Sequence, residues 1–182
     1  AATNGFSQTY SGSHYSLSTS VLAGEGTNME RDYDYTGAVY AVDLRTPEEV
    51  GRSAGEKAVR RLNPKKVDTN QVAVLFDNRV ARSLISHFAN AVNGSSIARD
   101  TSFLKDMMGQ KVFGDDINII DNPHRKRGLR SKPFDGEGVA NGKRRLIENG
   151  KLTTWLLDLR SAKQLGLQST GHASRSTSSP KR

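Results

Sequence analysis

The chain has 182 residues, with 27 Lys and Arg against 19 Asp and Glu, and a formal net charge of +8 at pH 7. This length is enough to bury the core of one domain. The chain has no cysteine, which excludes disulfides, a thiol nucleophile and thiolate metal ligands. No apolar run approaches the roughly 20 residues that span a bilayer, and no signal peptide opens the sequence. We therefore expect a soluble, cytoplasmic protein with no membrane partner.

The two ends of the sequence suggest a piece of a longer protein. The chain starts without a methionine and finishes in Ser, Arg and Lys residues. We expect a single domain over residues 1–173, which forms part of a larger region. Residues 174–182 are expected to be a flexible polar tail, because they lack apolar anchors.

The first forty residues alternate between apolar and polar side chains with a period of two, which indicates strands joined by hairpins. The alternation predicts strands over residues 16–22, 31–35 and 38–42. One buried face is expected to comprise Leu17, Val21, Tyr33 and Tyr35.

A helix start follows at Thr46–Glu49. Thr46 is the predicted cap, Pro47 occupies the first helical position, and Glu49 closes a capping box. Apolar residues at helical spacing extend this helix until Asn63 and Pro64 end it.

Residues 71–76 are predicted to be a buried strand that leads into a second helix capped at Asp77 and Asn78. Gly94–Ser96 is expected to break that helix. A short amphipathic helix is then predicted over 103–108, ended by Gly109.

The remaining elements indicate an antiparallel sheet. Strands are predicted over 117–121, 145–148 and 152–156, and Asn149–Gly150 is a strong signal for a type I′ hairpin. A last helical turn over 161–165 closes at Gly166. The predicted fold class is α+β, mainly antiparallel sheet with several packed helices.

Three sequence blocks carry a resemblance to a known family: Pro133–Val139, Leu146–Leu152 and Gln168–Ala173. Further matching blocks lie upstream, and they comprise Phe6–Ser11, Met29–Tyr33, Arg45–Val50 and Ser102–Leu104. Together the blocks resemble the TldD/PmbA family, on its PmbA (TldE) side. That family contains zinc peptidases and their metal-less partners.

The resemblance also implies where a metal site would lie. The zinc-bearing branch carries HExxxH on the helix after residues 71–76, with two imidazole ligands and a glutamate that activates water. In this chain the corresponding positions are Ile85, Ser86 and Asn90, and none of them supplies that chemistry. A cysteine ligand expected near Ile117 is also missing. We therefore expect no metal and no cofactor in this chain.

Asp135, Glu137 and His172 are the remaining candidates for a site. Gly136 and Gly138 allow the tight turn that would bring the two carboxylates together. Two such carboxylates could perform acid and base chemistry, or they could form a structural turn that shapes a peptide cleft. His172 lies in a glycine-containing block and is a candidate for the same cleft.

By resemblance, the predicted function is that of a non-catalytic subunit of a heteromeric metallopeptidase acting on small or unfolded polypeptides. A TldD-like subunit would supply the zinc. The alternative is a regulatory protein of the DNA gyrase modulator type. Its support in the sequence is the basic run at 124–132. That run has no interleaved aromatic residue for base stacking, so we expect no nucleic-acid partner. A third hypothesis is a self-sufficient hydrolase that uses Asp135, Glu137 and His172.

Overall fold

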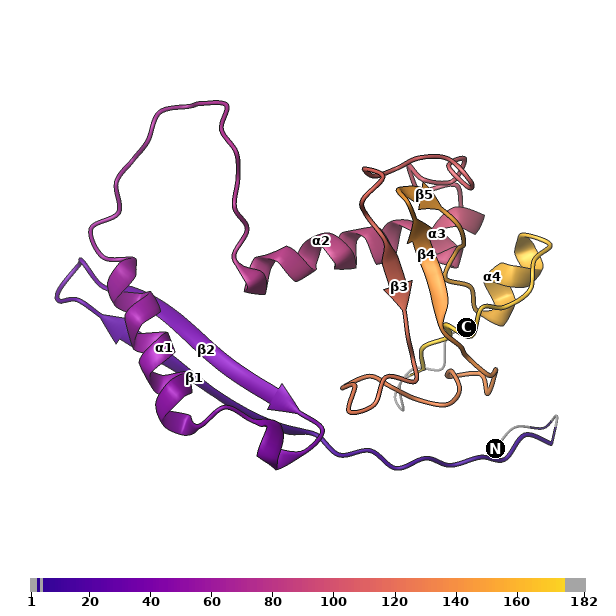
Figure 1. Cartoon of the computed structure of the whole chain (residues 1–182), viewed down its shortest axis with the longest axis horizontal. Coiled ribbons are helices and arrows are strands. Elements are labelled where there is room, and N and C mark those ends of the chain that lie inside the picture. The colour runs from indigo at the N-terminus through magenta and orange to yellow at the C-terminus, as the bar shows by residue number, and fades with distance from the viewer. Residues whose placement is uncertain (1–2, 4, 176–182) are drawn as a thin grey trace. The chain divides into compact units, whose positions relative to one another are not determined.

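The computed structural model describes residues 3 and 5–175 and divides into two compact units (Figure 1). We call residues 11–73 with 127–129 the ribbon unit, and the remainder the sheet unit. Residues 1–173, expected above to form a single domain, are thus divided between these units. Residues 176–182 of the expected flexible tail lie outside the described residues.

The ribbon unit consists of two long antiparallel strands and one helix. Strand β1 (Tyr15–Ala23) pairs with β2 (Glu30–Ala38) without interruption. Helix α1 (Pro47–Arg60) lies against the ribbon, and buries Val50, Ala54 and Ala58. These three residues recur every four positions, so they form one stripe along the helix.

The start of α1 is as predicted. Thr46 Oγ1 accepts the Glu49 N–H at 3.3 Å, and Glu49 Oε2 accepts the Thr46 N–H at 2.9 Å. Each side chain thereby satisfies a backbone donor that has no partner within the helix.

The strand register corrects the predicted buried face. Val21 lies opposite Asp32, whereas Tyr33 and Tyr35 lie opposite Ser20 and Ser18. Directly paired residues share a face of the sheet, so the two tyrosines are on the other face from Val21. The buried positions of β2 are Ala38 and two carboxylates, those of Asp32 and Asp34. Alternation alone does not reveal the register between two strands.

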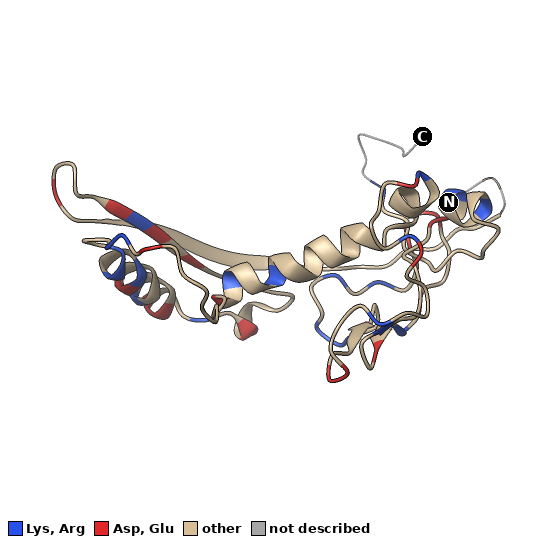
Figure 2. Ribbon diagram, turned by 90° about the horizontal axis from the view of Figure 1, so that it is seen from above, with Lys and Arg blue, Asp and Glu red and all other residues tan. Residues whose placement is uncertain are grey.

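Basic side chains from α1 and the segment before it form ion pairs with Asp34. Figure 2 marks the positions of Lys and Arg and of Asp and Glu along the ribbon. Asp34 Oδ2 lies 3.0 Å from Arg45 Nη2 and 3.1 Å from Lys57 Nζ. Burial raises the pKa of Asp34, but hydrogen bonds from Ser53, Arg45, Lys57 and the Tyr35 N–H outweigh it. The net effect holds the pKa of Asp34 well below its usual range.

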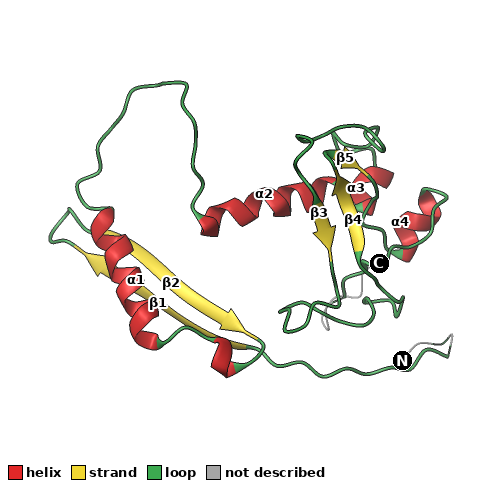
Figure 3. Cartoon of the chain, in the orientation of Figure 1, coloured by secondary structure: helices red, strands yellow, loops and turns green. Residues whose placement is uncertain are grey.

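Two predicted strands in this part of the chain are wrong. Of residues 38–42, only Ala38 lies in a strand, as the last residue of β2. The chain then enters the 3₁₀ helix η1 (Ala41–Asp43). Residues 71–76 lie in a long irregular segment between α1 and α2 (Figure 3), and the Leu75 side chain is 99% exposed. A strand requires a neighbouring strand for its backbone hydrogen bonds, and no such partner lies beside this segment within the described residues.

The sheet unit contains helix α2 (Asn78–Ala91), helix α3 (Gly94–Ala98) and helix α4 (Leu159–Gln164). Its strands are β3 (Ile119–Asp121), β4 (Arg144–Glu148) and β5 (Lys151–Leu152), in the antiparallel order β3-β4-β5. The core of this unit comprises Phe88, Ala91, Val92, Ile97, Leu104, Leu146, Ile147, Leu152, Trp155, Leu157 and Ala162. The α+β class with antiparallel pairing is confirmed.

The hairpin between β4 and β5 is as predicted, because Asn149 and Gly150 have φ values of 47° and 76°. The second helix does end before Gly94, at Ala91, but Gly94–Ser96 then begins α3. Two other expectations for this unit fail: residues 103–108 form turns instead of a helix, and the strand after the hairpin ends at Leu152. Asn93 caps α3 by accepting the Ser95 N–H at 3.0 Å, a local signal for a helix start.

Helices long and apolar enough to cross a bilayer do not occur among residues 3 and 5–175.

Asp34→Asn is expected to lower the free energy of unfolding at pH 7 by about 2–3 kcal/mol, because Lys57 and Arg45 lose a buried carboxylate. The folded-state pKa is depressed, so this stabilisation is complete above the ordinary pKa of 3.8 and is lost as the pH falls below it. Urea denaturation at several pH values should therefore show the two proteins converging in acid. Asp68→Asn, at an exposed loop position, is the matched control and should change little.

Gly150→Ala is expected to cost at least ~1 kcal/mol of unfolding free energy. Gly150 has φ +76°, and a Cβ there would lie 2.4 Å from the Phe113 carbonyl oxygen. Gly142→Ala is the control, because no atom lies within 4 Å of its Cβ position. Equal chemical denaturation midpoints for the two variants would contradict the prediction.

Candidate functional site

The positions expected to correspond to HExxxH lie on α2 and are exposed. The side chains of Ile85, Ser86 and Asn90 are exposed, and Ser86 Oγ donates to the Arg82 carbonyl within the helix at 3.3 Å. An isoleucine cannot bind zinc, and a serine cannot act as the carboxylate base. Within residues 3 and 5–175, no three His, Cys, Asp or Glu side chains cluster in a way that could hold a metal ion. The residues of this helix do not fit a zinc site.

Asp135 organises the turn in which it lies. Its side chain is 3% exposed. Oδ1 accepts the N–H groups of Glu137 and Val139, both at 2.9 Å, and Oδ2 accepts the Ala173 N–H at 2.9 Å. Three backbone donors thus occupy the carboxylate, and one of them comes from the block at 168–173. This is the geometry of a structural connection between two segments far apart in sequence.

The glycines beside Asp135 are required by close contacts. Gly138 has φ +80°, and a Cβ there would lie 2.8 Å from the Phe6 ring. Phe6 and Tyr10 both pack edge-on against Phe134, with ring centroids 5.1 and 5.3 Å away. The N-terminal segment therefore packs directly on this turn.

Glu137 connects the same turn to α4. Its Oε2 accepts the Leu159 N–H at 2.8 Å, one of the first backbone donors of the helix. Asp158 caps the helix as well, because its Oδ1 accepts the Ser161 N–H at 2.7 Å. Both carboxylates are thus hydrogen-bonded at the start of α4.

His172 lies between two other side chains. Its Nδ1 is 2.8 Å from Thr170 Oγ1, and its Nε2 is 3.2 Å from Asp121 Oδ2 at the end of β3. Thr170 is buried, and its hydroxyl also accepts the Leu157 N–H at 2.7 Å. These contacts hold the 169–173 segment against the sheet.

The side chains of Asp135, Glu137 and His172 do not hydrogen-bond to one another: they contact the Ala173 N–H, the Leu159 N–H and Asp121 Oδ2, respectively. The structure brings the blocks that contain these residues together through Asp135 and Ala173. Within the part of the chain that the structure describes, these three side chains do not form the shared acid–base pair that a self-sufficient hydrolase would need.

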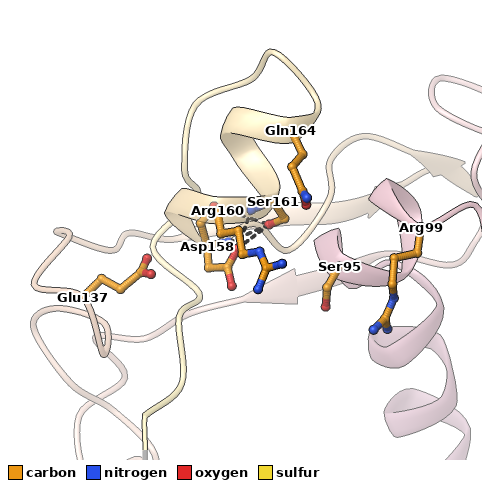
Figure 4. Close-up of a pocket in the computed structure, with 7 residues that line it drawn as sticks. All are labelled: Ser95, Arg99, Glu137, Asp158, Arg160, Ser161 and Gln164. Carbon is orange, nitrogen blue, oxygen red and sulfur yellow. Dashed lines mark hydrogen bonds between the residues drawn. The ribbon is translucent and has the colours of Figure 1, made fainter. Parts of the chain in front are cut away.

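A pocket of about 250 Å³ opens between α3 and α4 (Figure 4). Its lining comprises Ser95, Arg99, Glu137, Asp158, Arg160, Ser161 and Gln164. Of these, sequence patterns pointed only to Glu137. The others were missed because α3 and α4 are far apart in sequence, and only the fold brings them together.

A second pocket, of about 370 Å³, lies on the turn itself. Its apolar lining comes from Phe6, Phe134 and Leu159, and Glu137 lines both pockets. The polar part of its lining comprises Gln8, Asp135, Glu137 and Arg175. The turn at 133–139 therefore contributes to two hollows, each with a mixed polar and apolar lining.

The fold and these blocks define a domain pair of a metallopeptidase family. Residues 1–62 match the PmbA/TldA metallopeptidase central domain, and residues 69–182 match the PmbA/TldA metallopeptidase C-terminal domain. The chain belongs to the PmbA/TldA family.

Similar proteins support this assignment. The chain is 46% identical to the metalloprotease PmbA homolog of Haemophilus influenzae and 44% identical to metalloprotease PmbA of Escherichia coli O157:H7, each over 170 residues. These matches cover 93% of this chain but only 38% of the relatives' length.

Solved structures show the same fold. A Bacteroides thetaiotaomicron protein described as a candidate modulator of DNA gyrase superposes with a TM-score of 0.88 at 31% identity, over 94% of this chain and 39% of its own. TldE of Thermococcus kodakarensis superposes with a TM-score of 0.67 over 90% of this chain and 37% of its own. At 23% identity, this superposition shows that the two chains share a fold.

Asp135→Asn is expected to lower the unfolding free energy by about 1–3 kcal/mol, because the amide nitrogen cannot accept the buried Ala173 N–H. Hydrogen exchange should accelerate at the Ala173 amide in particular. Asp116→Asn, at an exposed position in the same unit, is the control. Unchanged protection of Ala173 in Asp135→Asn would show that the carboxylate does not connect the two blocks.

Proposed function

We propose that this chain is part of a catalytically silent subunit of a heteromeric metallopeptidase. A TldD-like partner would supply the zinc, the nucleophilic water and the general base. The pair would act in the cytoplasm on small or unfolded polypeptides.

The observation that carries this proposal is the chemistry of α2. Ile85, Ser86 and Asn90 stand where the zinc-bearing branch has HExxxH, while α2 itself is retained as a regular, capped helix. A zinc site needs three or four protein ligands, and this helix offers none of the expected imidazoles. The scaffold is kept and the metal-binding groups are replaced, which is the pattern of a subunit that supports catalysis by another.

The relatives named metalloprotease connect the chain to proteolysis. The pockets beside the 133–139 turn give the chain surfaces that could contact a polypeptide. In this proposal Asp135, Glu137 and His172 shape that surface and do not perform acid–base chemistry. Their hydrogen bonds to backbone and to neighbouring side chains support this role.

The alternative function, a regulator of the DNA gyrase modulator type, draws on the description of the Bacteroides structure and on the basic run. One residue of that run, Arg127, makes contacts within the protein. Arg127 Nη1 lies 2.6 Å from Asp43 Oδ1, and its guanidinium lies 4.7 Å from the centroid of the Tyr40 ring. Arg125 and Lys126 remain exposed, and changing both to Ala would test for salt-dependent binding to DNA.

The proposed function predicts co-elution. With a tag on this protein alone, the HExxxH-bearing paralogue of the same organism should elute with it at a fixed stoichiometry. The pair should hydrolyse unfolded polypeptides and lose this activity to a chelator, because the zinc is in the partner.

Matched variants in the two subunits distinguish their contributions to peptidase activity. Changing the HExxxH glutamate of the partner to Gln should abolish peptidase activity, whereas Ser86→Ala in this chain should leave the rate unchanged within about twofold. Chelator-sensitive hydrolysis by this protein in the absence of the partner would overturn the proposal.

A further inference from the structure

The pocket between α3 and α4 is lined by the side chain of Arg99. Arg99 follows directly after α3, and its side chain makes no hydrogen bond or ion pair with any residue of the described chain. Gln164, on the facing helix α4, likewise has an unengaged side-chain amide among the described residues. Figure 4 shows Gln164 extending from α4 and Arg99 extending from the residue after α3; both line the pocket.

The acidic residues of this pocket are already engaged. Glu137 Oε2 accepts the Leu159 N–H, and Asp158 Oδ1 accepts the Ser161 N–H and hydroxyl. These bonds point each carboxylate at the first turn of α4. The pocket therefore combines carboxylates that already accept hydrogen bonds with two exposed donors, Arg99 and Gln164, which have no partner among the described residues and are accessible to a ligand that carries an acceptor.

A carboxylate is the acceptor that this arrangement suits. A guanidinium binds a carboxylate through two parallel N–H···O bonds, and an amide nitrogen can donate one more. A volume of about 250 Å³ is smaller than the pockets that hold drug-sized ligands, roughly 300–1,000 Å³. It suits the end of a peptide or a single acidic side chain.

The second pocket extends the recognition. It shares Glu137 with the first and is lined on its apolar side by Phe6, Phe134 and Leu159. A peptide with its carboxylate at Arg99 could place an apolar side chain of the preceding residues against these rings. The two hollows together thus favour an apolar residue near a carboxylate.

We propose that Arg99 and Gln164 form a carboxylate-binding subsite that holds the C-terminal end of a polypeptide, with an apolar residue in the neighbouring pocket. This inference rests on the polypeptide substrates of the proposed function. It adds a recognition role to residues that lie away from α2.

Fluorescence anisotropy with three peptides tests the subsite on this protein without the zinc subunit. The first is fluorescein-Gly-Ser-Ala-Leu-Phe with a free C-terminal carboxylate, and the second is the same peptide amidated. The third is amidated and ends in Glu, which supplies a side-chain carboxylate alone. We expect the free acid to bind about tenfold more tightly than its amide. Tight binding of the Glu peptide in place of the free acid would assign the subsite to acidic side chains and overturn the C-terminal assignment.

Arg99→Ala should remove the preference for the free acid, Arg99→Lys should retain part of it, and Gln164→Ala should weaken it by less. Arg99 and Gln164 are exposed, so their replacement should leave the melting temperature unchanged. Arg125→Ala removes an exposed charge elsewhere and is the control for general electrostatic attraction.

Equal affinity for acid and amide in the unaltered protein, or no saturable binding of any peptide, would overturn the subsite. So would a preference that persists in Arg99→Ala. Co-elution with the zinc subunit does not depend on Arg99, so failure of the subsite and failure of the proposed function give different results.

Discussion

The carboxylate of Asp135 is the contact on which the site depends. It is buried, and it accepts N–H groups from its own turn and from Ala173. A buried carboxylate is costly unless its lone pairs are filled, so this one specifies where the two segments lie. The turn it fixes then carries Glu137 to the start of α4. Both pockets are lined by residues of this turn or by the helix it contacts.

Helices α3 and α4 illustrate how short elements can be held in place by polar contacts at their ends. Each begins with a side chain that accepts a backbone N–H, Asn93 for α3 and Asp158 for α4. Gly94 permits the close approach of the two, because a Cβ there would lie 2.5 Å from Ser161 Oγ. A helix of this length is not stable alone in water. Its position, and therefore the position of the Arg99 guanidinium, comes from packing.

Helix α2 and the ribbon differ in where their polar side chains lie and in what these side chains contact. On α2 the positions expected to correspond to the metal motif hold side chains without metal chemistry, and they are exposed. In the ribbon, buried carboxylates meet basic side chains, and Asp34 lies within 3.1 Å of Lys57. The function of this chain therefore depends on what α2 and the two pockets contact. The charged residues of the ribbon contribute to the stability of the fold.

The sequence by itself determined the family blocks, the helix caps at Thr46 and Asp77, the Asn149–Gly150 hairpin and the lack of ligand chemistry at Ile85 and Ser86. These are local features, written in neighbouring residues whose hydrogen bonds or chemical identity need no distant partner. Strand pairing is different, because an apolar run such as that of residues 71–76 becomes a strand only beside another strand. The register that buries Asp32 and Asp34, the contact of Asp135 with Ala173, and the pocket at Arg99 were decided by tertiary structure alone. Each joins residues far apart in the chain, and local pattern carries no information on which distant groups will meet.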